Sequence, residues 1–488
     1  MMRRIVALCS CAVLVAAMPR PVPGGEAWTS GEVARLQQQI DALLRAPAVR
    51  GAQVGFIAID TQRGRLLYSR NADQEFMPAS NFKLIVGSTA LARLGVNFSY
   101  VTTVLVDAPP ADGVENGNVY LRGGGDALLS AADLGDAAAA VAAAGIKSVT
   151  GSVVTDASHF DDQRLGFGWS WDDLPYYYAP VISALELEDG VVHVQESAGE
   201  AVGAPVTLQI EPQSGAFTID NELRTGPRGS MDTSNILRPW DEPETIALVG
   251  QYPLGGGESR DLAPSVPDPE SYAGDVLARA LAAHGVSVAG GVRRGRLPAH
   301  PTVLWSHNSL VMPQLLARFW YPSDNLMGEL LLKELGVLGF GEPGTDEHGA
   351  AVERAFLRSI GIDPRTVSIA DGSGLSSYDR ITPRDLLKIL TYDWKSPNRT
   401  IVLDALPLAG VRGTLRHQFL GTPAERHVWA KTGSISHVRT VSGFIQTRTH
   451  GVVTFSLLIN QWIGEERPGG SAALARLRGA ILSAIAVQ

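Results

Sequence analysis

Hydrophobic positions follow helical spacing near the N-terminus of the chain and strand-like spacing soon after it. Residues 31–45 repeat apolar side chains at helical intervals, which predicts an amphipathic helix. Residues 53–60 and 65–70 are typical of two strands joined by a turn. The C-terminal part carries three strand-like segments and a closing helix: 426–434, 438–447, 451–460 and 470–486. Because strands stand at both ends with helices between them, we expect the two ends of the chain to build one sheet.

The middle of the chain opens with a helix that is apolar over most of its length. Residues 80–94 predict a buried helix that ends before a glycine. Ser80 therefore begins this helix, and Lys83 stands one turn further on. Residues 270–284 and 309–337 also carry helical patterns.

Residues 96–265 differ from the rest because short strand-like pieces dominate there, with one alanine-rich helix at 131–144. We expect a large inserted β-rich α+β region here, carried by a catalytic domain made of residues 28–95 and 266–488. The glycine run at 123–126 lacks the Gly-Lys-Ser/Thr that a phosphate loop requires, so a tight turn is its simpler interpretation.

The first residues have the layout of a secretory signal peptide. Two arginines precede an apolar run at 5–17, and small residues and prolines follow. We assign residues 1–27 to this peptide. Cleavage after Ala17 or after Ala27 would remove both cysteines, so no disulfide or thiol chemistry is expected in the mature chain. We expect a periplasmic or otherwise extracytoplasmic protein with no integral membrane span after processing, and an uncleaved N-terminal anchor is the alternative.

Length and charge narrow the function further. The 488 residues exceed one typical core, which fits a large domain with an insertion. The net charge of −9 argues against a nucleic-acid partner, because phosphate binding requires a basic face. The basic run at 293–296 is too short to supply one, and a solvated loop is its simpler interpretation.

Three short motifs carry the candidate chemistry. Ser80 and Lys83 form a Ser-x-x-Lys pair, and a lysine at this distance can turn a serine hydroxyl into a nucleophile. A Ser-Asp-Asn sequence at 323–325 precedes a helix-like stretch, and a Lys-Thr-Gly sequence at 431–433 lies in a strand-like segment. Ser-x-x-Lys, Ser-x-Asn and Lys-Thr-Gly occur in this order in penicillin-binding proteins and serine β-lactamases.

The chemistry of an acyl enzyme explains these residue types. Lys83 can take the proton of Ser80 only as a neutral amine, a state that burial and a second cation such as Lys431 favour. Ser323 can relay a proton toward the leaving amine, and Asn325 can hydrogen-bond the substrate amide and hold the lysine. We therefore expect Ser80, Lys83, Ser323 and Asn325 to be catalytic.

The Lys-Thr-Gly segment supplies the expected substrate contacts. Lys431 and Thr432 can bind a terminal carboxylate, and Gly433 lets the substrate backbone lie against an edge strand. The backbone N–H groups of Ser80 and Ser434 can form an oxyanion hole. This chemistry uses no metal and no organic cofactor.

Each of these residues has a simpler structural interpretation when it is taken singly. Ser80 can be a helix cap, the two lysines solvated surface charges, and residues 323–325 a capping turn. Competing catalytic patterns are missing from the sequence, which has no Gly-x-Ser-x-Gly elbow and no His-Glu-x-x-His among its 10 histidines. His437 lies close to the Lys-Thr-Gly strand, where a packed or surface histidine is the simpler interpretation.

With these motifs together, nearly all of the mature chain resembles the D-Ala-D-Ala carboxypeptidase/endopeptidases of the class C low-molecular-mass penicillin-binding proteins. The further matching segments are Met-Pro-Ala-Ser at 77–80, Leu-Arg-Gly-Gly-Gly-Asp at 121–126, Asp-Gly-Ser-Gly-Leu-Ser at 371–376, Gly-Thr-Leu at 413–415 and Val-Ser-Gly-Phe at 441–444. The resemblance implies an α/β fold with a transpeptidase-like antiparallel sheet flanked by helices, similar to that of serine β-lactamases. It also implies a long insertion between the Ser-x-x-Lys and Ser-x-Asn elements, where serine β-lactamases have a much shorter connection.

The resemblance further implies a serine-type D-Ala-D-Ala carboxypeptidase, with DD-endopeptidase activity beside it, that acylates Ser80 with a peptidoglycan stem peptide and is deacylated by water. β-Lactams would acylate the same serine. An aspartate of the insertion, matched here by Asp156, would meet the amine of a diamino-acid side chain. Two positions depart from the family pattern: Ser377 replaces a basic residue that helps to hold the substrate side chain, and an acidic segment at 184–190 replaces an asparagine pair.

Two other functions would use the same features. A serine β-lactamase or esterase would share the acylation machinery and differ in fast deacylation, and the long insertion argues against it. A non-catalytic wall-binding or β-lactam-sensing module would keep the fold without the chemistry. The three intact motifs argue against such a module.

Overall fold

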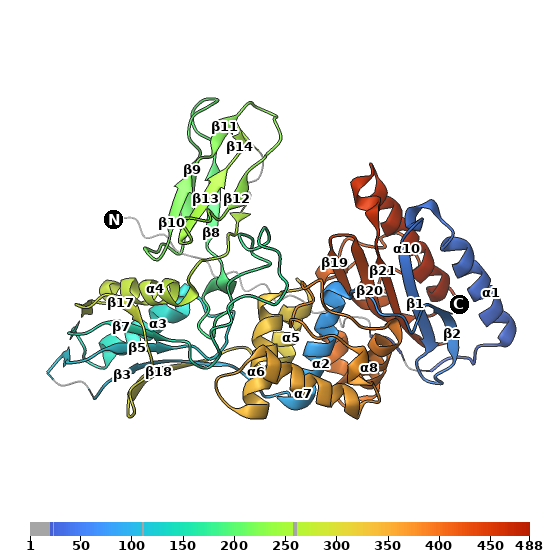
Figure 1. The fold of residues 1–488 in the computed structure, drawn as a ribbon, viewed down its shortest axis with the longest axis horizontal. Coiled ribbons are helices and arrows are strands. Elements are labelled where there is room, and N and C mark those ends of the chain that lie inside the picture. Colours follow the sequence, from blue (N-terminus) through green and yellow to red (C-terminus); the bar gives the residue numbers. More distant parts are fainter. Residues whose placement is uncertain (1–19, 23, 110–111, 257–260) are drawn as a thin grey trace, which may run out of the picture.

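The computed structural model describes residues 20–22, 24–109, 112–256 and 261–488 (Figure 1). Most of the expected signal peptide at 1–27, including both cysteines, lies outside the described residues. Within the described ranges, no helix is both long enough and apolar enough to cross a membrane.

The two ends of the chain build one antiparallel five-stranded sheet, as the strand patterns predicted. Its order is β19-β20-β21-β1-β2, so that β19 lies at an edge. The strands are β1 (Gln53–Asp60), β2 (Leu66–Arg70), β19 (Val428–Ile435), β20 (Val438–Gln446) and β21 (Val452–Asn460). β1 pairs with β21 along its whole length, from Gln53 opposite Asn460 to Asp60 opposite Val453. The N-terminal hairpin is therefore held by the last strand of the chain.

Helices cover both faces of this sheet, which confirms the predicted α/β architecture (Figure 1). On one face α1 (Ser30–Leu43) packs against α10 (Gly470–Ala486) over a core that includes the fully buried Phe56. On the other face lies a helical cluster with its own core. Its helices are α2 (Lys83–Arg93), α5 (Met312–Trp320), α6 (Leu326–Phe340), α7 (Asp346–Ser359), α8 (Pro383–Lys395) and α9 (Arg399–Ala405).

The helical pattern at 309–337 forms two helices, α5 and α6, and the second begins directly after the Ser-Asp-Asn sequence, as the motif predicted. The chain turns between them at residues 321–325, where Ser323 has a φ of 70°. Asp324 accepts a hydrogen bond from the backbone N–H of Met327 at 2.9 Å and so begins α6 in the manner of a cap. The break exposes the Ser-Asp-Asn sequence in a turn instead of burying it inside a helix.

The region inserted between α2 and α5 forms a separate body with its own core (Figure 1). A mixed sheet in the order β17-β7-β5-β3-β18 is covered by α3 (Ala131–Ala143) and α4 (Pro269–Ala283), which pack on each other. Its strands are β3 (Val101–Val106), β5 (Val119–Arg122), β7 (Val153–Asp156), β17 (Val292–Arg294) and β18 (Thr302–Asn308). The small β4 (Val114–Glu115), β6 (Ser148–Val149) and β16 (Ser287–Val288) pair beside them.

Short strands between β7 and α4 make an upright lobe on this body (Figure 1). They pair in three small sheets, of which two have three strands and one has two. They are β8 (His193–Ser197), β9 (Thr207–Glu211), β10 (Thr218–Asn221), β11 (Arg224–Gly226), β12 (Asn235–Leu237), β13 (Thr245–Val249), β14 (Gln251–Pro253) and β15 (Asp261–Leu262).

The insertion extends past the boundary expected at residue 265. β18 pairs with β3, and α4 packs against β7 and β17, so residues 269–308 complete the inserted sheet. We propose residues 96–309 as the inserted region. The helical pattern of 270–284 was predicted correctly, but its spacing could not show which body its apolar face covers.

A buried lysine joins this body to the catalytic domain. Lys333 of α6 has a side chain only 1% exposed, and its Nζ lies 2.6 Å from Asp161 of the insertion and 2.9 Å from Asp346 of α7. Removing one member of this buried group leaves the others as buried charges without a partner, which lowers the free energy of unfolding.

Replacing Lys333 should therefore destabilise the protein strongly. In Lys333→Met the two carboxylates lose their shared cation, and we expect the free energy of unfolding to fall by about 3–5 kcal/mol. Urea denaturation followed by circular dichroism measures this change. Lys388→Ala is the control, since Lys388 is 38% exposed beside Asp385 and should cost less than about 1 kcal/mol. Equal midpoints for the two variants would contradict the role given to Lys333.

Candidate active site

Ser80 lies in a 3₁₀ turn, Ala79–Phe82, that leads directly into α2. The helix predicted from residue 80 therefore begins in this tighter form. The turn is attached to the sheet by a hydrogen bond of 2.8 Å from the Thr440 hydroxyl of β20 to the carbonyl of Pro78. Because α2 is buried over most of its length, the position of Ser80 is set by packing on both sides of the turn.

Lys83 brings three distant segments of the chain together. Its Nζ lies 3.0 Å from Ser80 Oγ, 2.6 Å from Asn325 Oδ1 and 2.6 Å from the carbonyl oxygen of Ser373. Asn325 comes from the turn before α6, and Ser373 from the Asp-Gly-Ser-Gly-Leu-Ser segment. Two of the three partners are carbonyl oxygens, which only accept hydrogen bonds. A neutral Lys83 that donates to both of them directs its lone pair at Ser80.

Burial shifts Lys83 toward the neutral form. The side chain is fully buried, and this burial lowers the pKa of Lys83 to about 8, while the negative charge of Asp371 opposes the shift. The amine therefore titrates close to physiological pH, as a general base requires.

The second lysine expected at the site lies beside the first. Lys431 is fully buried, and its Nζ donates to Ser323 Oγ at 2.7 Å and to the carbonyl of Thr432 at 2.8 Å. Burial, and then the charge of Lys83, lower the pKa of Lys431 well below its usual value. Ser323 thus bridges Lys431 to the space above Ser80, in a position to pass a proton.

The edge strand β19 presents the rest of the Lys-Thr-Gly motif. A Cβ at Gly433 would lie 2.9 Å from the backbone N of Ser80, so only glycine lets β19 approach the nucleophile this closely. Thr432 donates its hydroxyl to that of Thr414 at 2.7 Å. Ser434 is exposed beside them and lines the cleft. One face of the cleft is thus an unpaired strand edge, which suits an extended peptide.

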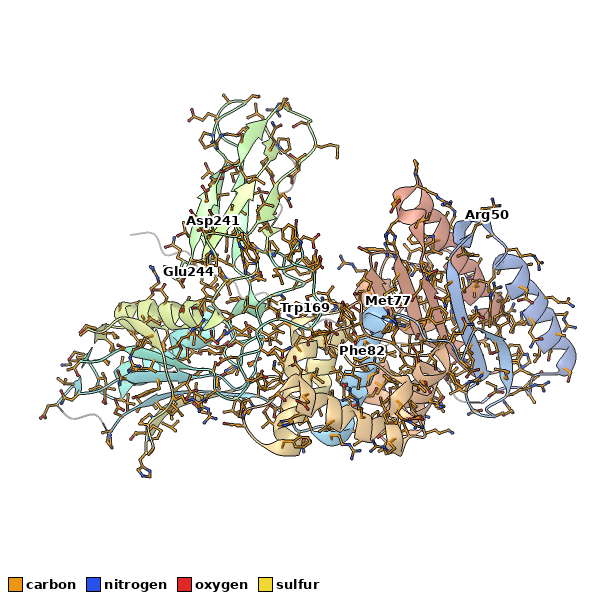
Figure 2. All side chains as sticks on the ribbon, in the orientation of Figure 1. Arg50, Met77, Phe82, Trp169, Asp241 and Glu244 are labelled. Atoms are coloured by element: carbon orange, nitrogen blue, oxygen red, sulfur yellow. The ribbon has the colours of Figure 1, made fainter. Side chains whose placement is uncertain are left out.

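The inserted region supplies a second layer of contacts. The carbonyl of Tyr178 accepts from Asn325 Nδ2 at 2.6 Å, which fixes the amide so that its oxygen faces Lys83. Trp169 donates its indole N–H to Asp371 at 2.9 Å, and Figure 2 places Trp169 at the junction of the two bodies. Asp371 also accepts from the backbone N–H groups of residues 373, 374 and 376, at 3.1, 2.6 and 2.7 Å. The segment that offers its carbonyl to Lys83 is therefore wrapped around one carboxyl group.

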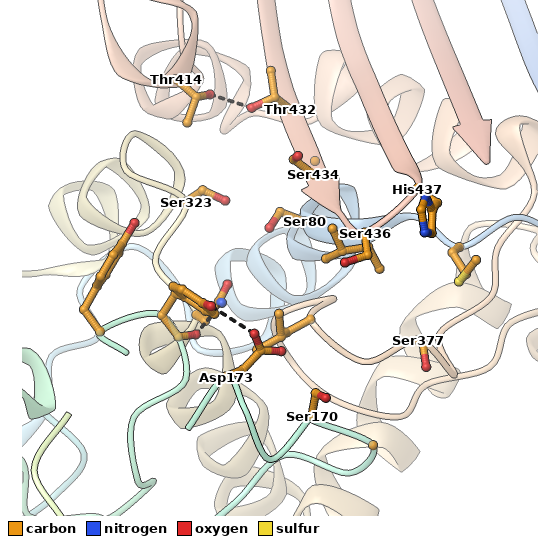
Figure 3. Close-up of a pocket in the computed structure, with 18 of the residues that line it drawn as sticks. Ser80, Ser170, Asp173, Ser323, Ser377, Thr414, Thr432, Ser434, Ser436 and His437 are labelled. Carbon is orange, nitrogen blue, oxygen red and sulfur yellow. Dashed lines mark hydrogen bonds between the residues drawn. The ribbon is translucent and has the colours of Figure 1, made fainter. Parts of the chain in front are cut away.

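These residues surround a cleft with a volume of about 950 Å³ (Figure 3). The predicted residues that line it are Ser80, Ser323, Asn325, Thr432, Gly433 and Ser434, while Lys83 and Lys431 lie buried in its floor. The insertion contributes Gly168, Ser170, Asp173, Tyr177 and Tyr178. No group of three or more His, Cys, Asp or Glu side chains that could hold a metal ion is found in the part of the chain that the structure describes.

Asp156 does not line this cleft, contrary to the expectation from the resemblance. It ends β7, where its carboxylate accepts from the backbone N–H groups of Ser158 at 2.9 Å and Leu297 at 2.7 Å. Both oxygens thus hold turns of the inserted sheet. The carboxyl group that does face the cleft is that of Asp173, which accepts from the Tyr178 hydroxyl at 2.9 Å and whose pKa is raised by burial.

Residues that the sequence analysis discussed outside the three motifs lie at different positions around the cleft. Ser377 lines the cleft, whereas Arg380 does not and instead donates to the carbonyls of Ser377 and Asp379. His437 lies at the rim with its side chain 45% exposed, 3.3 Å from Glu465. Apart from the two buried lysines, Asp173 and His437 are the acidic and basic side chains among the described residues that line the cleft.

Tyr177, Tyr178, Asp173 and Trp169 were missed by the sequence analysis. Half of the residues at 167–178 are aromatic, against 7% of the whole chain, and this concentration was the available signal. Ser373 contributes its backbone carbonyl oxygen. Every residue has such a group, so the sequence could not indicate this role.

Comparison with known proteins places the chain among peptidases. The family model described as the D-Ala-D-Ala carboxypeptidase 3 (S13) family matches residues 36–479. A D-alanyl-D-alanine carboxypeptidase of Actinomadura sp. (strain R39) is 34% identical over 472 residues, which cover 94% of this chain and 87% of that protein.

Solved structures with the same fold extend this comparison. Penicillin binding protein 4 (dacB) from Haemophilus influenzae has a TM-score of 0.78 and 24% identity, over 87% of this chain and 93% of that one. Bd3459, a predatory peptidoglycan endopeptidase from Bdellovibrio bacteriovorus, has a TM-score of 0.51 and 14% identity, over 90% of this chain and 95% of that one. Both support the predicted α/β fold class.

Removing the indole N–H of Trp169 should loosen the wrapped segment. In Trp169→Phe, Asp371 loses one donor in a buried position, and we expect the free energy of unfolding to fall by about 1–3 kcal/mol. Trp171→Phe is the matched control, because Trp171 is 77% exposed and should change stability by less than about 0.5 kcal/mol. Denaturant unfolding compares the two. If Trp169→Phe were as stable as Trp171→Phe, the bond to Asp371 would not support the segment.

Proposed function

Because the chain belongs to the D-Ala-D-Ala carboxypeptidase 3 (S13) family, it is a serine-type D-Ala-D-Ala carboxypeptidase that acts on peptidoglycan, and we propose that Ser80 forms its acyl enzyme. The contacts of Lys83 carry this proposal. Its two N–H bonds are taken by the carbonyl oxygens of Asn325 and Ser373, and its lone pair faces a hydroxyl 3.0 Å away. A base aligned in this way is the requirement for a serine nucleophile.

Acylation then follows from the positions of the groups. Ser80 Oγ attacks the carbonyl carbon of the penultimate D-alanine while its proton passes to Lys83. The backbone N–H groups of Ser80 and Ser434 stabilise the oxyanion. As the C–N bond breaks, the leaving nitrogen takes a proton through Ser323, and free D-alanine departs. The product is an ester between Ser80 and the shortened stem peptide.

Deacylation reverses the proton transfers. Lys83 is neutral again in the acyl enzyme, because the proton it took from Ser80 has left on D-alanine through Ser323. A water molecule attacks the ester carbonyl and gives a proton to Lys83, the C–O bond to Ser80 breaks, and the serine oxygen takes that proton back from Lys83. The peptide leaves with a new terminal carboxylate, and the enzyme returns to its starting state.

Lys431 and Thr432 are the proposed carboxylate site. Lys431 is buried beside Lys83, so each cation disfavours the other. A substrate carboxylate gives Lys431 a counter-ion and keeps it charged, and a charged Lys431 in turn favours the neutral form of Lys83. Binding of the correct terminus thus prepares the base.

We assign to Asp173 the substrate contact first expected of Asp156. Asp173 faces the cleft from the insertion, and in Figure 3 it lies across the cleft from β19. An amine on the third residue of the stem would find a carboxyl group there. Ser377 offers no cation to a second carboxylate of the same side chain, since Arg380 is turned away.

DD-endopeptidase activity is part of the proposal. The cleft is open along an unpaired strand edge, which leaves room for a substrate longer than a single peptide. The name of Bd3459 gives that activity for another protein of this fold. β-Lactams should bind the same site, since the Haemophilus influenzae protein has been crystallised in complex with one.

We place the enzyme outside the cytoplasm and propose signal cleavage after Ala17. Residues preceding Trp28 are attached to the folded domain: Glu26 donates its backbone N–H to Thr449 at 2.8 Å, and Arg20 lies 2.6 Å from Asp404. Trp28 itself is buried and stacks on His450 with centroids 4.3 Å apart. Cleavage after Ala27 would remove the first two of these contacts.

Loss of the nucleophile should abolish covalent chemistry. We expect Ser80→Ala to show no labelling by fluorescent penicillin and to release D-alanine slower by a factor on the order of 10⁴ or more. Ser170→Ala, which changes another serine of the cleft, should label normally. Labelled Ser80→Ala protein would refute the assignment, and an adduct hydrolysed within seconds would identify a β-lactamase instead.

Acylation should accelerate as the pH rises toward 8. Lys83 must be neutral to accept the proton, and its pKa is lowered to about 8, so the neutral fraction grows about tenfold per pH unit below that value and levels off above it. Stopped-flow acylation by a chromogenic cephalosporin between pH 5.5 and 9 measures this profile. A rate that stays constant across the range would exclude Lys83 as the base.

A further inference from the structure

A second pocket, here called the second lobe, adjoins the catalytic cleft and shares part of its wall, including Tyr177 and Tyr178. This lobe has a volume of about 460 Å³ and lies between the insertion and the start of α6. It shares five lining residues with the catalytic cleft: Tyr177, Tyr178, Pro322, Ser323 and Asn325. The remaining lining residues are Leu128, Glu188, Asp189, Val191, His193, Ala263, Arg318, Asp324 and Met327. The two tyrosines and the Ser-Asp-Asn turn are thus a partition with a pocket on each side.

The lobe is rich in charged groups. Arg318 points from the last turn of α5 and is exposed. Asp324 and two residues of the acidic segment, Glu188 and Asp189, lie around it. Asp189 Oδ1 is buried, and burial, followed by the charge of Asp324 and a hydrogen bond with it, raises the pKa of Asp189 well above its usual value. A cavity wall that holds an arginine and several carboxyl groups favours a polar, charged ligand.

In the binding mode proposed above, the second lobe lies on the leaving-group side of the scissile bond, because Ser323 lines it. A peptide along β19 places its reacting carbonyl between Ser80 and Ser434, and its C-terminal part at Thr432. Ser323, which would give the leaving nitrogen its proton, belongs to both pockets. A large leaving group that extends past Ser323 therefore enters the second lobe.

We propose that the second lobe binds the departing stem of a cross-linked peptide and so gives the enzyme its endopeptidase subsite. This inference rests on the proposed acyl-enzyme function. In a cross-link the leaving nitrogen belongs to the side chain of another stem, so the product that departs is a whole peptide with free carboxylates and amines. A single D-alanine needs no such space.

The charges of the lobe suit this peptide. A guanidinium forms paired hydrogen bonds with a carboxylate, so Arg318 is the anchor for a free carboxylate of the second stem. Glu188 and Asp324 can meet an amine, and Asp189 can donate to a peptide carbonyl. The acidic segment that departs from the family pattern in the sequence thereby acquires a role in substrate binding.

Two substrates with the same acyl part separate this subsite from the catalytic machinery. One is a monomeric pentapeptide stem, and the other is a defined dimer in which that stem is joined through its D-alanyl carbonyl to the side-chain amine of a second stem. For Arg318→Ala we expect kcat/KM toward the dimer to fall at least about fivefold, chiefly through KM. Hydrolysis of the monomer and acylation by penicillin should stay unchanged. Product masses give both rates from one assay.

Arg93→Ala is the matched control, because Arg93 is also an exposed arginine in the last turn of a helix. It should leave both substrates unaffected. An Arg318→Ala enzyme that cleaves the dimer normally, or loses both activities equally, would overturn the subsite, as would a wild-type enzyme that hydrolyses the monomer but never the dimer. A wild-type enzyme that is not acylated at Ser80 would instead refute the proposed function itself.

Discussion

A buried amine needs acceptors, and this requirement at Lys83 organises the protein. Its Nζ has no access to water, so each of its hydrogen bonds must come from the chain. They come from the nucleophile turn, from the Ser-Asp-Asn turn and from the Asp-Gly-Ser-Gly-Leu-Ser segment. Three segments that are remote in sequence must therefore meet within about 3 Å of one atom. The helices around α2 are packed so that they do.

The insertion also helps to hold the hydrogen-bond acceptors of Lys83 in place. Tyr178 orients the amide of Asn325, and Trp169 closes the shell of donors around Asp371, so two contacts of the base depend on residues outside the catalytic domain. Asp371 in turn is the main opposing influence on the lowered pKa of Lys83. An inserted body that looks like an accessory in Figure 1 therefore takes part in setting the protonation of the nucleophile's partner.

Sequence reasoning succeeded where a local pattern decides the outcome. The strand-like segments at both ends of the chain predicted the sheet, and three motifs with defined residue types led to the groups around Ser80. It was wrong where long-range packing decides. The apolar face of α4 could not show which core it covers, so the boundary was placed at 265. Asp156 and Asp173 are both aspartates of the insertion, and only the folded chain turns one into the cleft and the other into a backbone turn.

The sheet built from both ends of the chain also sets the order in which the enzyme can be assembled. β1 and β2 leave the ribosome early, yet β21, the partner of β1, is among the last segments made. The nucleophile turn rests on β20, and its strand-edge partner is β19, so neither support exists until the C-terminus has arrived. The inserted body, whose strands pair among themselves, has no such delay. The hydrolase therefore remains without an active site until nearly the whole chain has been made.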